Sequence, residues 1–268
     1  MTRKVKLLGI QMQSVFDDKI TNYQKIAKIL EENADFEPDL VLLPETFNSG
    51  YCAKNFKKNA EPIPNDQTSM FLSGFAQKYN TNIAGSMIES CPDKSLKNTL
   101  VIFGRKGELI TKYHKTHLFS HQGAEEGNYL TAGDKIVVAE LDFGKIGLSI
   151  CYDLRFPRMF RKMALEGAEI ILCPAAWPEV RQEHWEILNK ARAIENQVFI
   201  FGVNQVGKVT PKRADAGCSV LIDPWGEVIS SLGAEEGVLK AEIDLHKIDE
   251  VRKKLPVWQD RRLDLYEV

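Results

Sequence analysis

Short apolar runs alternate with amphipathic stretches along most of the chain, and this alternation limits the possible folds more than any other feature. The runs are rich in Val, Ile and Leu, which indicates buried strands, and the longer stretches repeat apolar residues at helical spacing. Strands are expected at residues 5–12, 40–43, 83–88, 98–103, 109–113, 136–141, 145–151, 170–173, 198–203, 218–222, 228–230 and 238–243. Helices are expected at residues 23–30, 68–79, 158–166 and 181–196. The chain is therefore expected to form an α/β fold.

Turn sequences connect some of these strands directly to their neighbours. Residues 104–107 and 142–144 contain glycines at positions that suit hairpin turns. Hairpins give antiparallel strand pairs and helical crossovers give parallel ones, so mixed sheets are expected, with room for a second sheet. No linker, repeat or change of composition divides the 268 residues, which favours a single domain over residues 1–268.

The C-terminal stretch differs from the rest of the chain. Residues 255–268 follow neither helical nor strand periodicity, and we expect an extended tail there. The tail carries Pro256, Trp258, Leu263, Leu265 and Tyr266. Apolar groups in such a segment need a surface on which to lie.

Composition excludes several classes of protein. The chain has 35 Lys and Arg against 37 Asp and Glu, which argues against electrostatic attraction to nucleic acid. The apolar run at residues 7–10 is far shorter than the roughly 20 residues that cross a membrane. Five cysteines lie far apart without a CxxC pair, so neither disulfides nor a thiolate metal site is expected. We expect a soluble, cytoplasmic protein with no nucleic-acid or membrane partner.

Glu45 follows directly on the apolar strand that ends at Pro44. A strand end positions a carboxylate rigidly, and apolar neighbours raise its pKa toward that of a usable proton carrier. A solvated loop glutamate is the alternative interpretation.

A basic and aromatic segment follows the strand at residues 109–113. Lys115 in this segment is suited to stabilise negative charge on a carbonyl oxygen, or it belongs to a basic surface loop. His114 and His117 are candidate metal ligands, but no second Cys/His pair has suitable spacing, so no metal is expected.

Cys151 stands between an apolar strand and an expected helix. Backbone N–H groups and the positive helix end stabilise a thiolate and an oxyanion at such a position, which suits a nucleophile. A buried, inert thiol is the alternative, and that interpretation is kept for Cys173 and Cys218 inside expected strands.

Together these three motifs resemble those of the carbon-nitrogen hydrolase (nitrilase) superfamily, whose catalytic set is glutamate, lysine and cysteine in that chain order. The similarity runs from residue 5 into the C-terminal tail. It implies a four-layer αββα sandwich of two mixed sheets. It also implies a homodimer or larger homo-oligomer with the tail across a subunit interface; a strap along the same subunit is the alternative.

The resemblance assigns a role to each candidate. Glu45 is implied as general base and acid, Lys115 as the oxyanion-stabilising lysine and Cys151 as the nucleophile, with the backbone N–H of Tyr152 as a second oxyanion donor. Glu126 is the best counterpart of a second active-site glutamate, although Glu125 is adjacent. No cofactor is implied, because an amide carbon is electrophilic enough for an activated thiolate.

Two segments resemble particular branches of the superfamily. Residues 151–157 are similar to the Nit-type omega-amidases, in which the arginine at the position of Arg155 binds a substrate carboxylate; a structural ion pair of Arg155 with Asp153 or another acid is the alternative. Trp177 with Arg181 resembles the bacterial branch that hydrolyses 2-oxoglutaramate. Trp177 is expected to wall the pocket, and Arg181 either adds charge for a dicarboxylate-like substrate or faces solvent.

The resemblance therefore implies hydrolysis of a small amide that carries a carboxylate, with release of ammonia through a cysteine thioester. The expected substrates are 2-oxoglutaramate and 2-oxosuccinamate. An amidase for deaminated glutathione or an N-carbamoyl compound is the alternative within the same chemistry. A non-catalytic family member that binds a small molecule or a partner is the alternative outside it.

Overall fold

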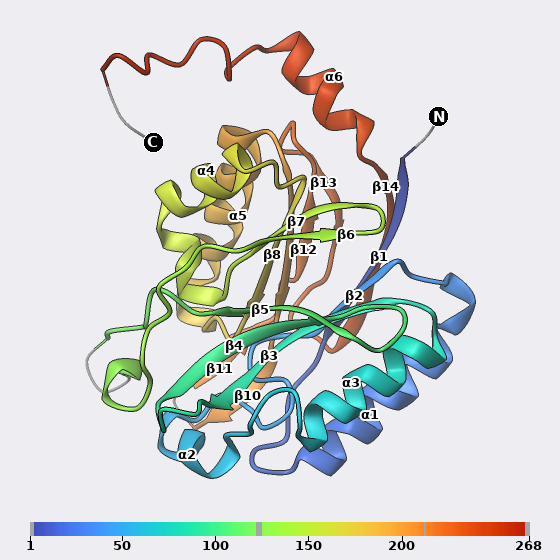
Figure 1. The fold of residues 1–268 in the computed structure, drawn as a ribbon, viewed down its shortest axis with the longest axis vertical. Coiled ribbons are helices and arrows are strands. Elements are labelled where there is room, and N and C mark those ends of the chain that lie inside the picture. Colours follow the sequence, from blue (N-terminus) through green and yellow to red (C-terminus); the bar gives the residue numbers. More distant parts are fainter. Residues whose placement is uncertain (1–2, 122–124, 212, 266–268) are drawn as a thin grey trace.

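Two six-stranded β-sheets form the centre of the molecule, with helices on the outside (Figure 1). The computed structural model describes residues 3–121, 125–211 and 213–265. The sheets pack face to face through one continuous apolar core, to which strands of both sheets contribute. This arrangement is the expected α/β fold with two mixed sheets.

The first sheet has the strand order β14-β1-β2-β3-β4-β5. Its strands are β1 Lys4–Gln11, β2 Leu40–Leu42, β3 Asn82–Ser90, β4 Leu96–Phe103, β5 Leu109–His114 and β14 Gly237–Asp244. β1 pairs in parallel with β2 and antiparallel with β14, so the sheet is mixed, as the sequence predicts.

The second sheet has the order β13-β12-β9-β8-β7-β6. Its strands are β6 Val138–Leu141, β7 Gly144–Leu148, β8 Ile170–Ala175, β9 Phe199–Asn204, β12 Val220–Ile222 and β13 Val228–Ser231. The central strands β7, β8 and β9 are parallel, and the outer strands are antiparallel to their neighbours. β8 and β9 are buried along their whole length, which explains their unbroken apolar sequence.

Helices cover the outer face of each sheet and complete the four-layer αββα sandwich. α1 and α3 pack on the first sheet, and each begins with an aspartate, Asp18 or Asp66, whose side chain accepts a bond from a backbone N–H of the first turn. α4 and α5 pack on the second sheet. The helices are α1 Lys19–Glu32, α2 Phe56–Asn59, α3 Gln67–Lys78, α4 Pro157–Leu165, α5 Gln182–Asn196 and α6 His246–Lys254. Short 3-10 helices occur at Ala34–Phe36, Ala53–Asn55, Glu126–Asn128, Cys151–Arg155 and Glu179–Arg181.

Strand β1 shows how the layers are joined. Leu7 packs in the core between the sheets, whereas its neighbour Leu8 packs in the core beneath α1 and α3. Gly9 faces the other sheet, where a β-carbon would lie 2.7 Å from Cγ2 of Val203. A larger residue at Gly9 would therefore push the two sheets apart.

The expected elements are confirmed in most places, but four expected strands are shorter than predicted: those at 40–43 and 136–141 are β2, Leu40–Leu42, and β6, Val138–Leu141, and the other two end or begin near a cysteine. The strand expected at 145–151 ends at Leu148, and Cys151 begins a 3-10 helix. The strand expected at 218–222 begins only at Val220, because Cys218 has a φ of +52°, which is incompatible with strand pairing. Cys218 therefore precedes the strand, and its thiol is partly exposed, whereas Cys173 is buried in β8 as expected.

The sequence did not predict α6 or a hairpin formed by β10, Val206–Thr210, and β11, Arg213–Ala216. Only Ile248 and Val251 of α6 are buried, so its apolar stripe is too narrow to recognise. The hairpin is short, and β10 alternates between part-buried and exposed residues after its first position.

The described part of the tail, residues 255–265, contains turns but no helix or strand. Trp258 is half-buried among the guanidinium groups of Arg161, Arg252 and Arg261, which lie 5.1, 4.7 and 4.8 Å from its ring centre. Leu263 and Leu265 are 62% and 68% exposed. Tyr266 lies outside the described residues.

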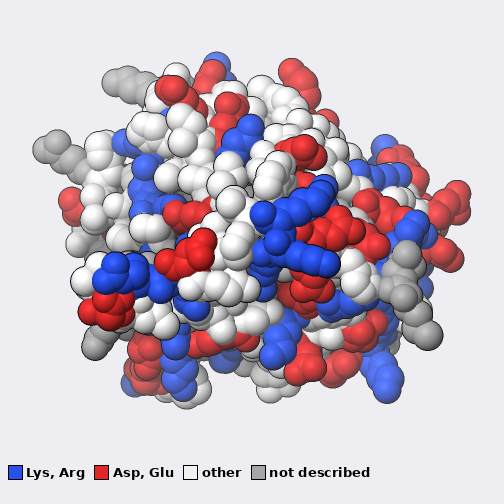
Figure 2. Space-filling model, turned by 90° about the horizontal axis from the view of Figure 1, so that it is seen from above, with Lys and Arg blue, Asp and Glu red and all other residues white. Residues whose placement is uncertain are grey.

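Charged side chains of both signs lie interspersed over the face seen in Figure 2. This distribution agrees with the near-balance of acidic and basic residues in the sequence. In the three described ranges, every helix lacks the length or the apolar character needed to cross a membrane.

Candidate active site

Residues that follow strands of both sheets meet at one cavity of about 250 Å³. Lys115 comes directly after β5, Ala176 directly after β8, and Cys151 three residues after β7. The cavity is lined by Tyr51, Lys115, Phe119, His121, Cys151, Tyr152, Arg155, Ala176, Trp177, Pro178, Val180, Arg181 and Arg213. The structure thus brings Lys115, Cys151 and the three expected substrate-binding residues to a single site.

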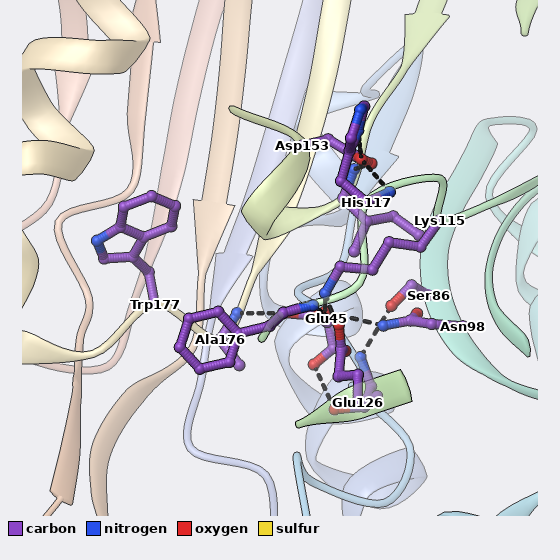
Figure 3. Close-up of polar contacts among 12 residues, drawn as sticks. Glu45, Ser86, Asn98, Lys115, His117, Glu126, Asp153, Ala176 and Trp177 are labelled. Carbon is purple, nitrogen blue, oxygen red and sulfur yellow. Dashed lines mark hydrogen bonds and ion pairs between the residues drawn. The ribbon is translucent and has the colours of Figure 1, made fainter. Parts of the chain in front are cut away.

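Lys115 is fully buried between two carboxylates (Figure 3). Its Nζ lies 2.9 Å from Oε1 of Glu45 and 2.9 Å from Oε1 of Glu126. Burial lowers the pKa of Lys115, but the charges of Glu126 and Glu45 outweigh it and raise the pKa well above its ordinary value. Lys115 is therefore a fixed cation at the cavity wall.

Glu45 follows β2 and Pro44 and is completely buried. Its Oε1 also accepts a hydrogen bond from Asn98 Nδ2 at 2.8 Å, and its Oε2 accepts one from the backbone N–H of Ala176 at 2.9 Å. Gln205 Nε2 donates to its backbone carbonyl at 2.7 Å. These contacts exclude the solvated-loop interpretation and fix the orientation of the carboxylate.

Glu126, rather than its neighbour Glu125, is the glutamate beside Lys115. Glu126 is fully buried, and its Oε2 accepts a 2.6 Å hydrogen bond from the backbone N–H of Phe119. Glu125 is exposed and bonds to Asn128. The burial of one glutamate and the exposure of the next decide between the two candidates that the sequence left open.

Cys151 lines the cavity with an unusual backbone conformation. Its φ is +46°, in the left-handed region that non-glycine residues adopt at a cost. Burial and the charge of Glu45 raise the pKa of the thiol well above its ordinary value, although Lys115 and the Ala176 backbone N–H act in the opposite direction. Cys151 begins a 3-10 helix rather than directly preceding an α-helix, and burial opposes ionisation of its thiol.

Trp177 and Arg155 form one wall of the cavity. Trp177 is 2% exposed, its backbone N–H donates to Asn204 Oδ1 at 2.7 Å, and the Arg155 guanidinium lies 4.6 Å from its ring centre. Burial lowers the pKa of Arg155, and the neighbouring charge of Arg181 adds to the effect. Within the described part of the chain no carboxylate forms an ion pair with Arg155, and Asp153 bonds elsewhere. The ion pair with Asp153 is therefore wrong, and no other acid of the described residues takes its place.

Arg181 and Arg213 add two further guanidinium groups to the cavity. Arg181 lies 5.9 Å from the Phe119 ring centre, and its carbonyl accepts a bond from Trp177 Nε1. Arg213 donates to the carbonyl of Ala176 and to Asp215, both at 3.1 Å. Sequence reasoning missed Arg213, because the hairpin that carries it was not predicted. The lining described here contains three arginines and no acidic residue, which favours an anionic ligand.

A group with possible metal-ligand atoms lies outside this cavity. Ligand atoms of Glu89, Cys91 and His114 lie within 4.8 Å of one another. Lys112 forms an ion pair with Glu89, and Thr99 donates to the same carboxylate at 2.9 Å. The carboxylate is already neutralised by a lysine, which opposes binding of a cation there.

Comparison with known proteins agrees with this geometry. The carbon-nitrogen hydrolase family model matches residues 9–253. The 2-oxoglutaramate amidase of Bacillus subtilis is 38% identical over 242 residues, which cover 90% of this chain and 92% of the relative. Human omega-amidase NIT2 is 34% identical over 277 residues, which cover 99% of this chain and 97% of the relative. Saccharomyces cerevisiae Nit3, described as a member of branch 10 of the nitrilase superfamily, superposes with a TM-score of 0.90 at 31% identity and 97% coverage of both chains. The chain thus belongs to the carbon-nitrogen hydrolase family and is an amide-hydrolysing enzyme of the nitrilase superfamily.

Proposed function

We propose that this protein is an omega-amidase, which hydrolyses the terminal amide of a small 2-oxo acid such as 2-oxoglutaramate or 2-oxosuccinamate through a cysteine thioester. The observation that carries the proposal is the buried cluster of Glu45, Lys115 and Glu126 beside Cys151, in a cavity rich in arginine. The names of the amidases from Bacillus subtilis and human support the same substrate class.

The first half of the reaction forms the thioester. Glu45 takes the proton of the Cys151 thiol as the sulfur attacks the amide carbon, because burial and the charge of Glu45 raise the pKa of the thiol and oppose its ionisation without a base. The Lys115 ammonium and the backbone N–H of Tyr152 stabilise the oxyanion of the tetrahedral intermediate. Glu45 then gives its proton to the leaving nitrogen, and ammonia departs.

The second half cleaves the thioester. Glu45, now ionised, removes a proton from a water molecule that attacks the thioester carbon, and the same two donors stabilise the second oxyanion. The Cys151 sulfur leaves and recovers its proton from Glu45. The acid is released and the enzyme returns to its starting protonation state.

Glu126 has a supporting role in this proposal. It balances the charge of Lys115 and, through the Phe119 backbone N–H, fixes the loop between these residues. Lys115 therefore keeps its proton and its position while the charge on Glu45 changes during the cycle.

Recognition of the substrate carboxylate is proposed for Arg155, with Arg181 close by. The Arg155 guanidinium lies over the Trp177 ring, and one of its terminal nitrogens lies 3.3 Å from His184 Nδ1, which leaves its other N–H groups for hydrogen bonds to a carboxylate. Its lowered pKa reflects burial without an anionic partner, and a bound carboxylate supplies that partner. Trp177 provides an apolar wall for the methylene groups between the amide and the acid.

The experiment that tests this function is ammonia release across a substrate panel. The panel contains 2-oxoglutaramate, 2-oxosuccinamate, deaminated glutathione, an aliphatic amide, an N-carbamoyl amino acid and a nitrile. The two omega-amides should give the highest kcat/KM, and a brief reaction quenched in acid should show the acyl adduct on Cys151 by mass spectrometry. A higher kcat/KM for deaminated glutathione or the N-carbamoyl compound would assign those substrates instead, and no turnover of any compound would indicate a non-catalytic protein.

We further propose that the enzyme acts in the cytoplasm as a homodimer or larger homo-oligomer, without nucleic-acid or membrane partners. The exposed Leu263 and Leu265 of the tail support contact with a second copy.

A further inference from the structure

We propose that Asp153 is a positioning residue that fixes the Cys151 turn against the Lys115 segment, and that His117 is the side chain that completes its bonding. The inference rests on the proposed catalytic roles of Cys151 and Lys115. Asp153 does not line the cavity described above, so its effect on the reaction is exerted through these two residues.

Asp153 is a fully buried carboxylate that accepts hydrogen bonds on both oxygens. Its Oδ2 accepts from the backbone N–H of Ile150 at 2.9 Å and from the Tyr113 hydroxyl at 2.7 Å. Its Oδ1 accepts from the His117 backbone N–H at 3.0 Å, from His117 Nδ1 at 2.8 Å and from Thr116 Oγ1 at 3.2 Å. Donors therefore surround an ionised carboxylate, which accepts on both oxygens and donates on neither.

These donors belong to the two segments that carry the proposed catalytic groups. Ile150 immediately precedes Cys151 and follows β7 of the second sheet, whereas Thr116 and His117 immediately follow Lys115 and β5 of the first sheet. Oδ1 bonds to the Lys115 segment, whereas Oδ2 bonds both to Ile150 and to Tyr113 of β5. The carboxylate is consequently a bridge between the segment after β7 of the second sheet and the segment after β5 of the first, and Figure 3 shows it beside His117.

The contacts of Asp153 also account for the left-handed backbone conformation of Cys151. A φ of +46° at a cysteine persists only where the surrounding contacts impose it. The Asp153 side chain accepts from Ile150 N–H, its backbone N–H donates to the Ile150 carbonyl at 3.0 Å, and its carbonyl accepts from Phe156 N–H at 2.9 Å. Asp153 thus closes the turn on both sides of the nucleophile.

His117 is the partly exposed member of the group of residues that bond to Asp153. Its ring stacks on Phe156 with 3.6 Å between ring centres, and its side chain is 32% exposed. Because a carboxylate only accepts, His117 Nδ1 carries the proton in this contact. The imidazole therefore supplies a donor at a fixed position, and an asparagine side chain can present an N–H near the same place.

Asp153→Asn is the direct test. The asparagine amide has one oxygen that accepts and one nitrogen that donates. Either the N–H of Ile150 or the N–H groups of His117 would therefore face a donor instead of an acceptor. Misplacement of a reacting group by about 1 Å can cost roughly 100-fold in rate. We expect kcat to fall by about this factor and KM to change less than about threefold, since the carboxylate-binding arginine is not among the contacts of Asp153.

Two further comparisons separate positioning from general loss of structure. Glu89→Gln is the matched control, because Glu89 is also a buried carboxylate that accepts from a histidine, His114, at 2.9 Å, but it lies outside the cavity. It should keep kcat near the wild-type value. His117→Ala should lower kcat, and His117→Asn should recover most of it by restoring the donor.

The outcomes distinguish the inference from the function on which it depends. Turnover by Cys151→Ala would refute both the proposed mechanism and this role for Asp153. If Cys151→Ala is inactive while folded Asp153→Asn keeps its kcat, only the positioning role is refuted. If Asp153→Asn does not fold, the histidine pair decides: recovery by His117→Asn supports the role, and equal kcat in both histidine variants and the wild type overturns it.

Discussion

Replacing Lys115 by Met tests how the buried charges of the site depend on one another. Methionine has a similar length but no charge, so Glu45 and Glu126 would lose the cation that lies 2.9 Å from both. Two carboxylates would then share a site from which water is excluded. Both kcat and the free energy of unfolding should decrease, for separate physical reasons.

The loss of stability follows from the unpaired charges. Removing one partner of a buried ion pair costs about 3 to 5 kcal/mol, and here two carboxylates lose the same partner. At about 2 to 4 °C per kcal/mol for a chain of this size, the melting temperature should fall by roughly 10 °C. Lys112→Met is the control, because Lys112 pairs with the buried Glu89 but is itself 37% exposed, and His114 still donates to that carboxylate. It should cost about 1 kcal/mol or less.

The pH dependence has a definite sign. In the variant, a buried carboxylate next to another has a raised pKa in the folded state. Folding therefore takes up a proton. The loss of stability should consequently become smaller as the pH falls toward the ordinary carboxyl pKa of about 4. In the wild type, the raised pKa of Lys115 contributes stability that is present below the unfolded value of 10.5 and is lost as the pH rises through the folded value. Urea unfolding of both proteins at pH 5.5 and pH 8 measures the difference. A loss below about 1 kcal/mol, or one equal at both pH values, would contradict the proposed charge balance.

Other predictions concern chemistry, recognition and assembly. Cys151→Ala should abolish ammonia release while circular dichroism and the melting temperature stay close to the wild type, because only a small group is removed; retained turnover would exclude Cys151 as nucleophile. Glu45→Gln should lower kcat by at least about 10²-fold, and a change in KM alone would exclude proton transfer. Arg155→Met should raise KM for 2-oxo omega-amides by about 10- to 100-fold, the effect of one charged hydrogen bond, but leave uncharged amides nearly unchanged. Equal losses on both would indicate a structural role. Deleting residues 255–268 should shift sedimentation toward the monomer; an unchanged oligomer would refute the interface role of the tail.

The periodicity of the sequence determined the main layers of the fold. Strands such as β8 and β9 are recognisable because burial on both faces requires apolar residues throughout, and α1 is recognisable because one face alone is buried. The candidate residues Glu45, Lys115 and Cys151 were also found from sequence, because each follows a strand of a two-sheet fold and together they match a family motif. Elements with few buried residues, such as α6, have too weak a hydrophobic periodicity to be predicted from sequence.

Only the tertiary structure decided which polar groups meet. Glu125 and Glu126 are equivalent in sequence, but the turn that begins at Glu126 buries one and exposes the other. The sequence suggests Asp153 only as a possible partner of Arg155, yet three of the residues that bond to its side chain belong to a segment about 40 residues away. Arg213 joins the cavity through an unpredicted hairpin. Periodicity reports whether a residue is buried, whereas hydrogen-bond partners depend on how distant segments pack, which no local pattern encodes.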